Sequence, residues 1–204
     1  MVTSTLENEG KSSCTVNLAL ALAKNGNNVL LIDGDIRKPS IDLIFGLKPD
    51  KSFNKYYDGE SEWDEQVVHL EKEDLYVLLA EADLKRAEEM VSSEKFKDII
   101  NDAREEFDYV IIDTSPCRNL NEPMIIDEYV DASIFVIKQN YAKIEYINET
   151  IQRLAAVKGN VIGAIYISSI NAGNISSRIG YGYGRYGSRY GYNRYSGYSK
   201  EKRS

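Results

Sequence analysis

Runs of consecutive apolar residues recur along this 204-residue chain, and polar or amphipathic stretches separate them. Apolar and polar positions do not alternate within these runs, which is typical of strands that are buried on both faces of a parallel sheet. The pattern predicts that residues 2–4 are the end of a strand, and that further strands lie at 29–32, 75–79, 109–112, 132–137 and 161–167.

Helical patterns fill the intervals between the predicted strands. Apolar spacing, Ser caps and glycine stops predict helices or helical turns at 14–24, 41–47, 93–106, 144–158 and, briefly, after Pro123. The polar stretch 51–71 is expected to be irregular, with helical pieces around 63–68. Strands that alternate with helices indicate an α/β layered fold with a mainly parallel sheet, whose ligands bind beyond the carboxyl ends of the strands.

The segment Gly10-Lys11-Ser12-Ser13 lies between the first predicted strand and the first predicted helix. This is the position of a phosphate-binding loop, in which backbone N–H groups and the positive end of the helix hold polyphosphate oxygens. Lys11 is placed to reach the β- and γ-phosphates, and the Ser12 hydroxyl is placed to bind magnesium. The segment therefore predicts ATP and Mg²⁺ as ligands.

The residues just before Gly10 depart from the usual pattern of such a loop. Thr5 stands where a glycine is expected, and Glu7 and Glu9 bring carboxylates near the phosphates, which is expected to weaken anion binding. Asn8 can adopt the left-handed conformation that glycine usually supplies. The alternative interpretation is a short polar loop that opens an ordinary helix.

Acidic residues stand at the ends of two predicted strands. Asp113 ends the run 109–112, in the position of an aspartate that holds magnesium directly or through water. Asp33 and Asp35 occupy alternate positions after the run 29–32, so both can face the phosphate pocket while the segment stays extended. One can bind magnesium while the other accepts a proton from an attacking hydroxyl. The alternatives are a loop-capping role for Asp113 and a solvated turn for Asp33 and Asp35.

Arg37 follows the acidic pair, and two roles are open to it. It can stabilise charge on the transferring group, or it can merely pair with the neighbouring acids. The Gly10 loop, the acidic pair and Asp113 all fall at the carboxyl edge of the predicted sheet, so we expect them to form one site.

The composition, with 43% hydrophobic and 28% charged residues, is ordinary for a globular protein. No run approaches the roughly 18 apolar residues of a membrane helix, and no signal peptide opens the chain. Cys14 and Cys117 are too few for a disulfide framework, and the single His69 argues against a histidine-rich metal site or a Ser-His-Asp triad. These features favour a cytoplasmic protein.

The composition changes near the C-terminus, and we expect a folded domain over 1–173 followed by a disordered tail over 174–204. Glu201 is the only acid of the tail, which is basic although the whole chain carries a net charge of −7. Such a tail can stack on single-stranded nucleic acid, form weak condensates, or accept phosphate beside a magnesium–ATP site. The tyrosines expected to accept phosphate are Tyr181, Tyr183, Tyr186, Tyr190, Tyr192, Tyr195 and Tyr198.

Taken in order, GKSS at 10–13, VLLIDGDIRKPS at 29–40, YVIIDTSPC at 109–117 and the tyrosine-rich terminus resemble the bacterial tyrosine kinases of capsule and exopolysaccharide synthesis. The resemblance covers nearly the whole chain, and the combination of motifs is far more specific than its parts. It implies a three-layer α/β/α P-loop NTPase fold with a mainly parallel central sheet.

The resemblance also implies roles for individual residues. It implies that residues 10–12 form the Walker A motif, that Asp33 and Asp35 form a second Walker-like motif, and that Asp113 is the Walker B aspartate. It also implies that Asp33 is the preferred general base. The residues predicted to bind nucleotide are Asn8, Glu9, Gly10, Lys11, Ser12, Ser13 and Arg37, those predicted to bind magnesium are Ser12, Asp35 and Asp113, and those predicted to be catalytic are Lys11, Asp33, Asp35 and Asp113.

Partners and location follow from the same resemblance. It implies ring-like homo-oligomers in which one subunit phosphorylates its neighbour's tail, activation by a membrane adaptor protein, and a cognate tyrosine phosphatase. The expected place is the cytoplasm, peripheral at the inner face of the cell membrane through the adaptor. No nucleic acid partner is expected.

Some segments depart from the family pattern. Family members usually carry an upstream segment with an Arg-rich helical motif, whereas this chain begins at Met1 inside the first strand, as expected of a truncated or differently started chain. Glu81 to Glu88 replaces a Gly-Pro-Pro-rich segment, Ser168 stands where related ATPases place Asn, and Glu7-Asn8 replaces Pro-Gly. These departures fit a catalytically weakened member.

The sequence thus predicts an ATP-dependent protein tyrosine kinase that phosphorylates its own tail and regulates capsular or exopolysaccharide synthesis and export. One alternative is a partition- or division-site ATPase of the same P-loop class, similar to ParA or MinD. The other is a non-enzymatic module that binds nucleic acid through its tail.

Overall fold

The computed structural model describes residues 1–157 and 159–168 of the chain. Its strands are β1 (Val2–Ser4), β2 (Val29–Asp33), β3 (Val67–Leu70), β4 (Leu75–Leu78), β5 (Tyr109–Asp113), β6 (Ser133–Lys138) and β7 (Val161–Ile167). Its helices are α1 (Lys11–Lys24), α2 (Ile41–Phe45), α3 (Phe53–Tyr57), α4 (Ala87–Ser92), α5 (Glu94–Glu106), α6 (Glu122–Asp127) and α7 (Ile144–Val157), with a 3₁₀ turn at Asp64–Gln66.

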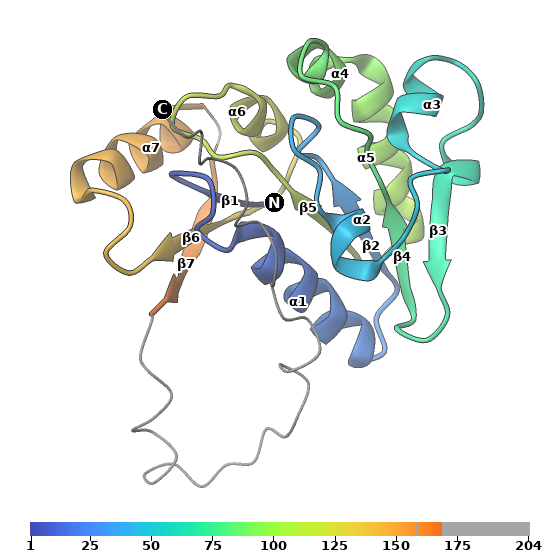
Figure 1. The fold of residues 1–204 in the computed structure, drawn as a ribbon, viewed down its shortest axis with the longest axis horizontal. Coiled ribbons are helices and arrows are strands. Elements are labelled where there is room, and N and C mark those ends of the chain that lie inside the picture. Colours follow the sequence, from blue (N-terminus) through green and yellow to red (C-terminus); the bar gives the residue numbers. More distant parts are fainter. Residues whose placement is uncertain (158, 169–204) are drawn as a thin grey trace, which may run out of the picture. The chain divides into compact units, whose positions relative to one another are not determined.

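The seven strands of this part of the chain form one sheet in the order β3-β4-β2-β5-β1-β6-β7 (Figure 1). All neighbouring pairs are parallel except β3 and β4, which are antiparallel. Strands β1 and β5 are adjacent, and the strands β2 and β5 run in register so that Asp33 lies opposite Asp113. The carboxyl ends of the central strands therefore meet at one edge, as predicted.

Helices cover both faces of the sheet, which gives the predicted α/β/α layers. One core cluster joins Val16 and Ala19 of α1 and Ile41 of α2 to apolar residues of β2 and β4. A larger cluster on the other face takes Phe96 from α5 and Leu154 from α7. The three-layer α/β/α fold with a mainly parallel sheet is confirmed.

The amphipathic helix predicted over 93–106 forms for the reasons that the sequence gives. The Ser93 hydroxyl accepts the backbone N–H of Phe96 at 3.2 Å and so caps the amino end of α5. The stripe at helical spacing is buried against the sheet and consists of Phe96, Ile99, Ile100 and Ala103. The predicted strands and the helices at 41–47 and 144–158 also form, although residue 158 lies outside the described part.

The interval 51–71 was predicted wrongly in part. Helical structure around 63–68 is limited to the three-residue 3₁₀ turn, and Val67 begins a strand that pairs antiparallel with β4. His69 on β3 stacks on Tyr76 of β4 with ring centroids 4.3 Å apart, a cross-strand pair that favours the hairpin. The helices α3 and α4 were not predicted.

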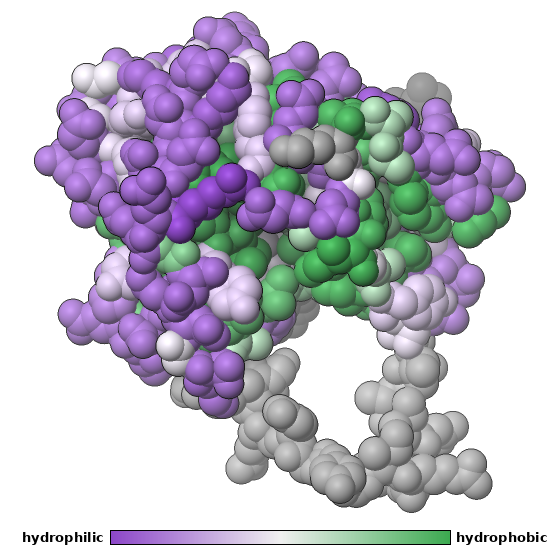
Figure 2. Space-filling model, turned by 180° about the vertical axis from the view of Figure 1, so that it is seen from behind, coloured by the Kyte–Doolittle hydropathy of each residue, from purple (hydrophilic) through white to green (hydrophobic). Residues whose placement is uncertain are grey.

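Most of the face seen in Figure 2 is hydrophilic, and hydrophobic residues gather toward its middle. Large apolar side chains that are exposed among the described residues include Ile144 on α7 and Ile162 and Tyr166 on the edge strand β7. Among the helices of residues 1–157 and 159–168, none has the length and hydrophobicity of a membrane-spanning segment. The predicted tail over 174–204, with its seven tyrosines, lies outside the described residues.

Candidate nucleotide-binding and phosphotransfer site

The loop between β1 and α1 has the backbone form that the sequence predicts. Asn8 is left-handed with φ 60°, and Gly10 has φ 94° just before the helix begins at Lys11. Ser12 and the exposed Ser13 lie in the first turn of α1, where N–H groups have no partner within the helix. The loop therefore presents donors and the positive end of a 14-residue helix at the carboxyl edge of the sheet.

The two glutamates of the loop point to different surroundings. Glu7 is exposed and its carboxylate pairs with the Lys38 ammonium at 3.3 Å. Glu9 is fully buried, and its carboxylate accepts the backbone N–H of Leu6 at 2.7 Å and that of Lys138 at 3.4 Å. Both oxygens of Glu9 are thus turned to amide donors of the protein.

Lys11 lies between Asp35, two residues after the end of β2, and Asp113, the last residue of β5. Its Nζ is 3.4 Å from Oδ2 of Asp35 and 4.0 Å from Oδ1 of Asp113, and all three side chains are buried. The structure thus brings together the predicted lysine, the second acid of the pair and the Walker B aspartate. The Lys11 ammonium is therefore flanked by the carboxylates of Asp35 and Asp113.

Asp113 combines features of a metal ligand. Its Oδ1 accepts the Thr15 hydroxyl at 3.0 Å, whereas its Oδ2 is buried without a partner among the described residues. Burial raises the pKa of Asp113, and the charge of Lys11 and the hydrogen bond from Thr15 act in the opposite direction. A buried carboxylate oxygen without a hydrogen bond is costly, so an oxygen-seeking cation fits here.

The oxygen donors at this position are compatible with Mg²⁺. Within 1–157 and 159–168, no three His, Cys, Asp or Glu side chains converge on a common metal position. Mg²⁺ in nucleotide sites needs no such group, because phosphates and water complete its coordination beside one or two protein ligands. Ser12, Asp35 and Asp113 are the residues that would hold it.

Asp33 is turned away from Lys11 into the chain that follows β2. Its Oδ2 accepts the backbone N–H groups of Ser40 and Ile41 at 3.0 and 3.1 Å, and its Oδ1 accepts that of Asp35 at 3.3 Å. Burial, with the charge of Asp113, raises the pKa of Asp33 to about 7. Burial also raises the pKa of Asp35, against the charge of Lys11.

Arg37 contacts neither acid of the pair. Its Nε donates to Glu122 Oε1 at 2.6 Å, and Nη1 donates to the carbonyl of Leu84 at 3.4 Å. The idea that Arg37 pairs with Asp33 or Asp35 is therefore wrong, because the buried carboxylate of Glu122 on α6 takes the guanidinium instead. Glu122 and Thr15 were both missed by the sequence interpretation.

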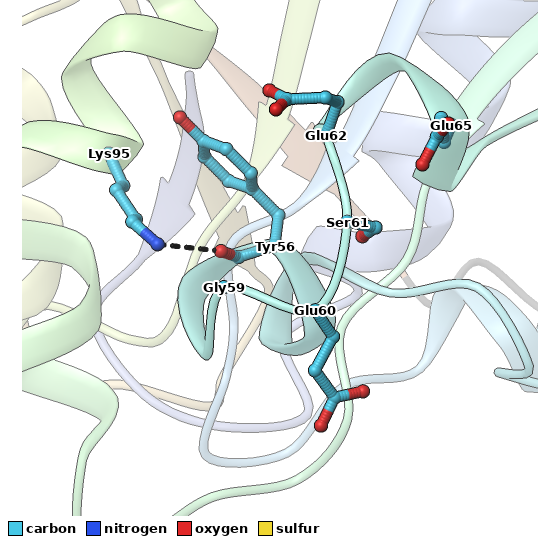
Figure 3. Close-up of a pocket in the computed structure, with 7 residues that line it drawn as sticks. All are labelled: Tyr56, Gly59, Glu60, Ser61, Glu62, Glu65 and Lys95. Atoms are coloured by element: carbon cyan, nitrogen blue, oxygen red, sulfur yellow. Dashed lines mark hydrogen bonds between the residues drawn. The ribbon is translucent and has the colours of Figure 1, made fainter.

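A separate cavity of about 530 Å³ lies beside α3 and the 3₁₀ turn (Figure 3). It is lined by Tyr56, Gly59, Glu60, Ser61, Glu62, Glu65 and Lys95. Lys95 donates to the backbone carbonyls of Tyr56 and Tyr57, so its ammonium is already engaged. None of the residues predicted for the site lines this cavity.

Comparisons with known proteins identify relatives of the chain and of its fold. The AAA domain family matches residues 8–165. "Tyrosine-protein kinase YwqD" of Bacillus subtilis is 31% identical over 183 residues, which cover 90% of this chain and 76% of that protein. The solved kinase domain of VpsO is 32% identical with a TM-score of 0.78, and the match covers 82% of this chain and 83% of that one.

A more distant solved structure shares the fold alone. The septum site-determining protein MinD from Pyrococcus horikoshii, solved with Mg-ADP, has a TM-score of 0.70 and 20% identity, and covers 81% of this chain and 68% of that one. The nearer matches, with the loop at Gly10 and the acidic strand ends, decide the family. The chain belongs to the bacterial tyrosine-protein kinase family and has its P-loop NTPase fold.

Proposed function

We propose that the chain is an ATP-dependent protein tyrosine kinase whose main substrate is its own C-terminal tyrosine cluster. The observation that carries the proposal is the convergence of Lys11, Asp35 and Asp113 beside the loop that precedes α1. This is the arrangement needed to hold a metal-bound triphosphate with its terminal phosphate toward the sheet edge. Family membership supports transfer to tyrosine as the activity.

Each residue of the site has a part in binding or positioning. The N–H groups from Asn8 to Ser13 hold phosphate oxygens, and Lys11 leaves its carboxylate partners to neutralise the β- and γ-phosphates. Ser12, Asp35 and Asp113 would hold Mg²⁺, which would supply charge neutralisation and alignment of the phosphates. Arg37 forms an ion pair with Glu122 of α6, which ties the chain after β2 to that helix.

The transfer exchanges one phosphorus–oxygen bond for another. The bond from the γ-phosphorus to the bridging oxygen of ADP breaks, a bond from the phenolic oxygen of tyrosine forms, and the phenolic proton passes to an aspartate. We assign this last role to Asp33, which adjoins Asp113 across the β2–β5 pair. Its carboxylate is bonded to backbone N–H groups of 35–41, so that segment must shift before Asp33 meets a hydroxyl.

Transfer between subunits, an activating membrane adaptor, a reversing tyrosine phosphatase and control of capsular or exopolysaccharide synthesis complete the proposal. Each rests on the sequence resemblance. Together they place the kinase at the inner face of the cell membrane through its adaptor.

The test is incubation with labelled ATP and Mg²⁺, with and without a candidate adaptor, followed by mapping of phosphotyrosine in 174–204. We expect signal on the tail tyrosines and none in Lys11→Met. An unchanged signal in that variant would refute the site. To test transfer between subunits, a Lys11→Met chain that keeps its tail is mixed with an active chain that ends at residue 173. Absence of label in the tail would contradict transfer between subunits.

An ATPase of the MinD type is the second candidate, because the fold of MinD bound to Mg-ADP is shared. ATP hydrolysis at a steady rate without any phosphotyrosine would favour it. Binding of nucleic acid that depends on the tail, without ATP turnover, would favour a non-enzymatic module.

A further inference from the structure

Glu9 sits inside the phosphate-binding loop, where a carboxylate is unexpected. Its side chain is fully buried, and each of its oxygens accepts one backbone N–H, Oε2 from Leu6 at 2.7 Å and Oε1 from Lys138 at 3.4 Å. Leu6 belongs to the loop itself, whereas Lys138 is the last residue of β6. One side chain thus links the loop to the end of a strand that is 129 residues away along the chain.

A second bond runs the opposite way between the same two segments. The Lys138 Nζ donates to the backbone carbonyl of Asn8 at 3.2 Å. Asn8 is one of the two left-handed residues of the loop, and Gly10 is the other. Glu9 stands between them, so anchoring its side chain fixes the orientation of the peptide groups on either side.

The end of β7 supports the same arrangement. The N–H of Gln139, next to Lys138, donates to the carbonyl of Ile167 at 2.8 Å. The Ile167 Cδ1 lies so near Gly10 that a Cβ on that glycine would be 2.6 Å from it. The loop is therefore held by the ends of β6 and β7 as well as by its own strand and helix.

We propose that Glu9 is a positioning residue that, with Lys138, clamps the phosphate-binding loop to the end of β6 and so sets its affinity for nucleotide phosphates. The donors of such a loop are backbone N–H groups, and they bind tightly only when they already point toward the phosphates. This inference rests on the nucleotide-binding part of the proposed function and not on transfer to tyrosine.

The sign of one substitution separates the clamp from a simple charge effect. A carboxylate that merely lies near phosphates repels them, so its removal in Glu9→Gln would tighten nucleotide binding. A clamp predicts the reverse, because the glutamine carbonyl can accept only one of the two N–H groups. Glu9→Ala accepts neither and is expected to weaken binding further.

The experiment measures binding of a fluorescent ADP analogue with Mg²⁺ to the full chain. We expect the dissociation constant to rise about tenfold in Glu9→Ala, the scale of losing hydrogen bonds to a charged group, and to rise less in Glu9→Gln. Lys138→Met keeps the backbone N–H of residue 138 and the Glu9 carboxylate, but it removes the hydrogen bond from Nζ to the Asn8 carbonyl. It is therefore expected to weaken nucleotide binding by a few-fold, the scale of one hydrogen bond to an uncharged acceptor. In phosphorylation assays the KM for ATP should rise by more than kcat falls.

Glu7→Gln is the matched control, since Glu7 is on the same loop, exposed, and paired with Lys38. It is expected to leave the dissociation constant unchanged or slightly lower. Thermal unfolding without nucleotide shows which variants are folded. If Glu9→Ala does not fold, Lys138→Met still tests the clamp. Tighter or unchanged nucleotide binding in folded Glu9→Gln and Lys138→Met overturns the clamp. If these variants weaken nucleotide binding as expected but the chain never phosphorylates tyrosine, only the proposed kinase activity is contradicted.

Discussion

The hydroxyl of Thr15 donates to Oδ1 of Asp113 at 3.0 Å and leaves Oδ2 of that carboxylate buried and unbonded within the described part of the chain. The same hydroxyl oxygen lies 2.9 Å from the carbonyl oxygen of Lys11, one helical turn earlier, so both acceptors compete for its single proton. The same helix therefore carries Lys11 and, through Thr15, contacts the acid at the end of β5. One oxygen of Asp113 is held by Thr15, and the other has no hydrogen-bond donor among the described residues, which supports the proposed metal role.

Asp113→Asn is expected to remove magnesium-dependent nucleotide binding and to lower phosphotransfer at least about 100-fold, because a metal contributes several kcal/mol of charge stabilisation. The unfolding temperature of the nucleotide-free chain is expected to stay level or rise. Asp35 and Asp113 share the Lys11 ammonium, and the charge of Asp113 also repels the buried carboxylates of Asp33 and Asp35, so its loss relieves repulsion. Calorimetry with and without MgCl₂ and ADP measures both effects.

The exposed acid Glu105 provides the comparison for this substitution. Glu105→Gln is expected to change neither nucleotide binding nor unfolding temperature. Magnesium-dependent binding that persists in Asp113→Asn would contradict the metal assignment.

Lys11→Met is expected to change stability in the opposite direction. The ammonium is buried between Asp35 and Asp113, and removal of one partner from a buried ionic group typically costs about 3 kcal/mol or more. We expect a clear fall in the free energy of unfolding, measured in urea without nucleotide, together with loss of phosphotyrosine. Lys24→Met, at the exposed end of α1, should leave both quantities unchanged.

Much of this site could be predicted because its residues sit at ends of recognisable elements. A run of apolar residues followed by an acid places Asp113, and a glycine followed by Lys11 places the loop. Thr15 could have been found from its spacing, since it lies four residues after Lys11 on the same helix face. The partners of Arg37 and Asp33 could not, because they depend on how α6 and the chain after β2 pack.

The elements that were missed are short and owe their form to tertiary contacts. The helix α4 has six residues and is held by Met90 and Val91, both fully buried. The strand β3 is a four-residue segment whose apolar pattern fits helix or strand equally well. Its pairing with β4 decides the outcome, and a pairing partner is not a local property of the sequence.

Alkylation of the two free cysteines should report opening of the chain beside the site. Burial raises the pKa of Cys117 to about 12, its Sγ lies 3.0 Å from the Thr3 hydroxyl, and its side chain has no exposed surface. Burial also raises the pKa of the partly exposed Cys14. A raised thiol pKa means less thiolate at pH 8, so both should react more slowly than a free thiol.

Iodoacetamide at pH 8 is therefore expected to modify Cys14 first and to modify Cys117 only in denaturant. Mass spectrometry of tryptic peptides over time distinguishes the two sites. The rate at Cys14 should rise as the pH goes from 7 to 9, because the thiolate fraction grows, while that at Cys117 stays limited by opening. Fast modification of Cys117 in the folded chain would show that the segment 114–121 opens freely.

Gly34 lies where the end of β5 leaves no space for a side chain. Its N–H donates to the carbonyl of Asp113 at 2.8 Å, and a Cβ would lie 2.7 Å from that same oxygen. The clash is with backbone, so Gly34→Ala must push the chain after β2 away from the end of β5. We expect a loss of about 2 kcal/mol in the free energy of unfolding and weaker magnesium–nucleotide binding. Gly163→Ala, on the edge strand with nothing within 4 Å, should stay within about 0.5 kcal/mol and keep its affinity, so equal effects of the two substitutions would refute the close approach.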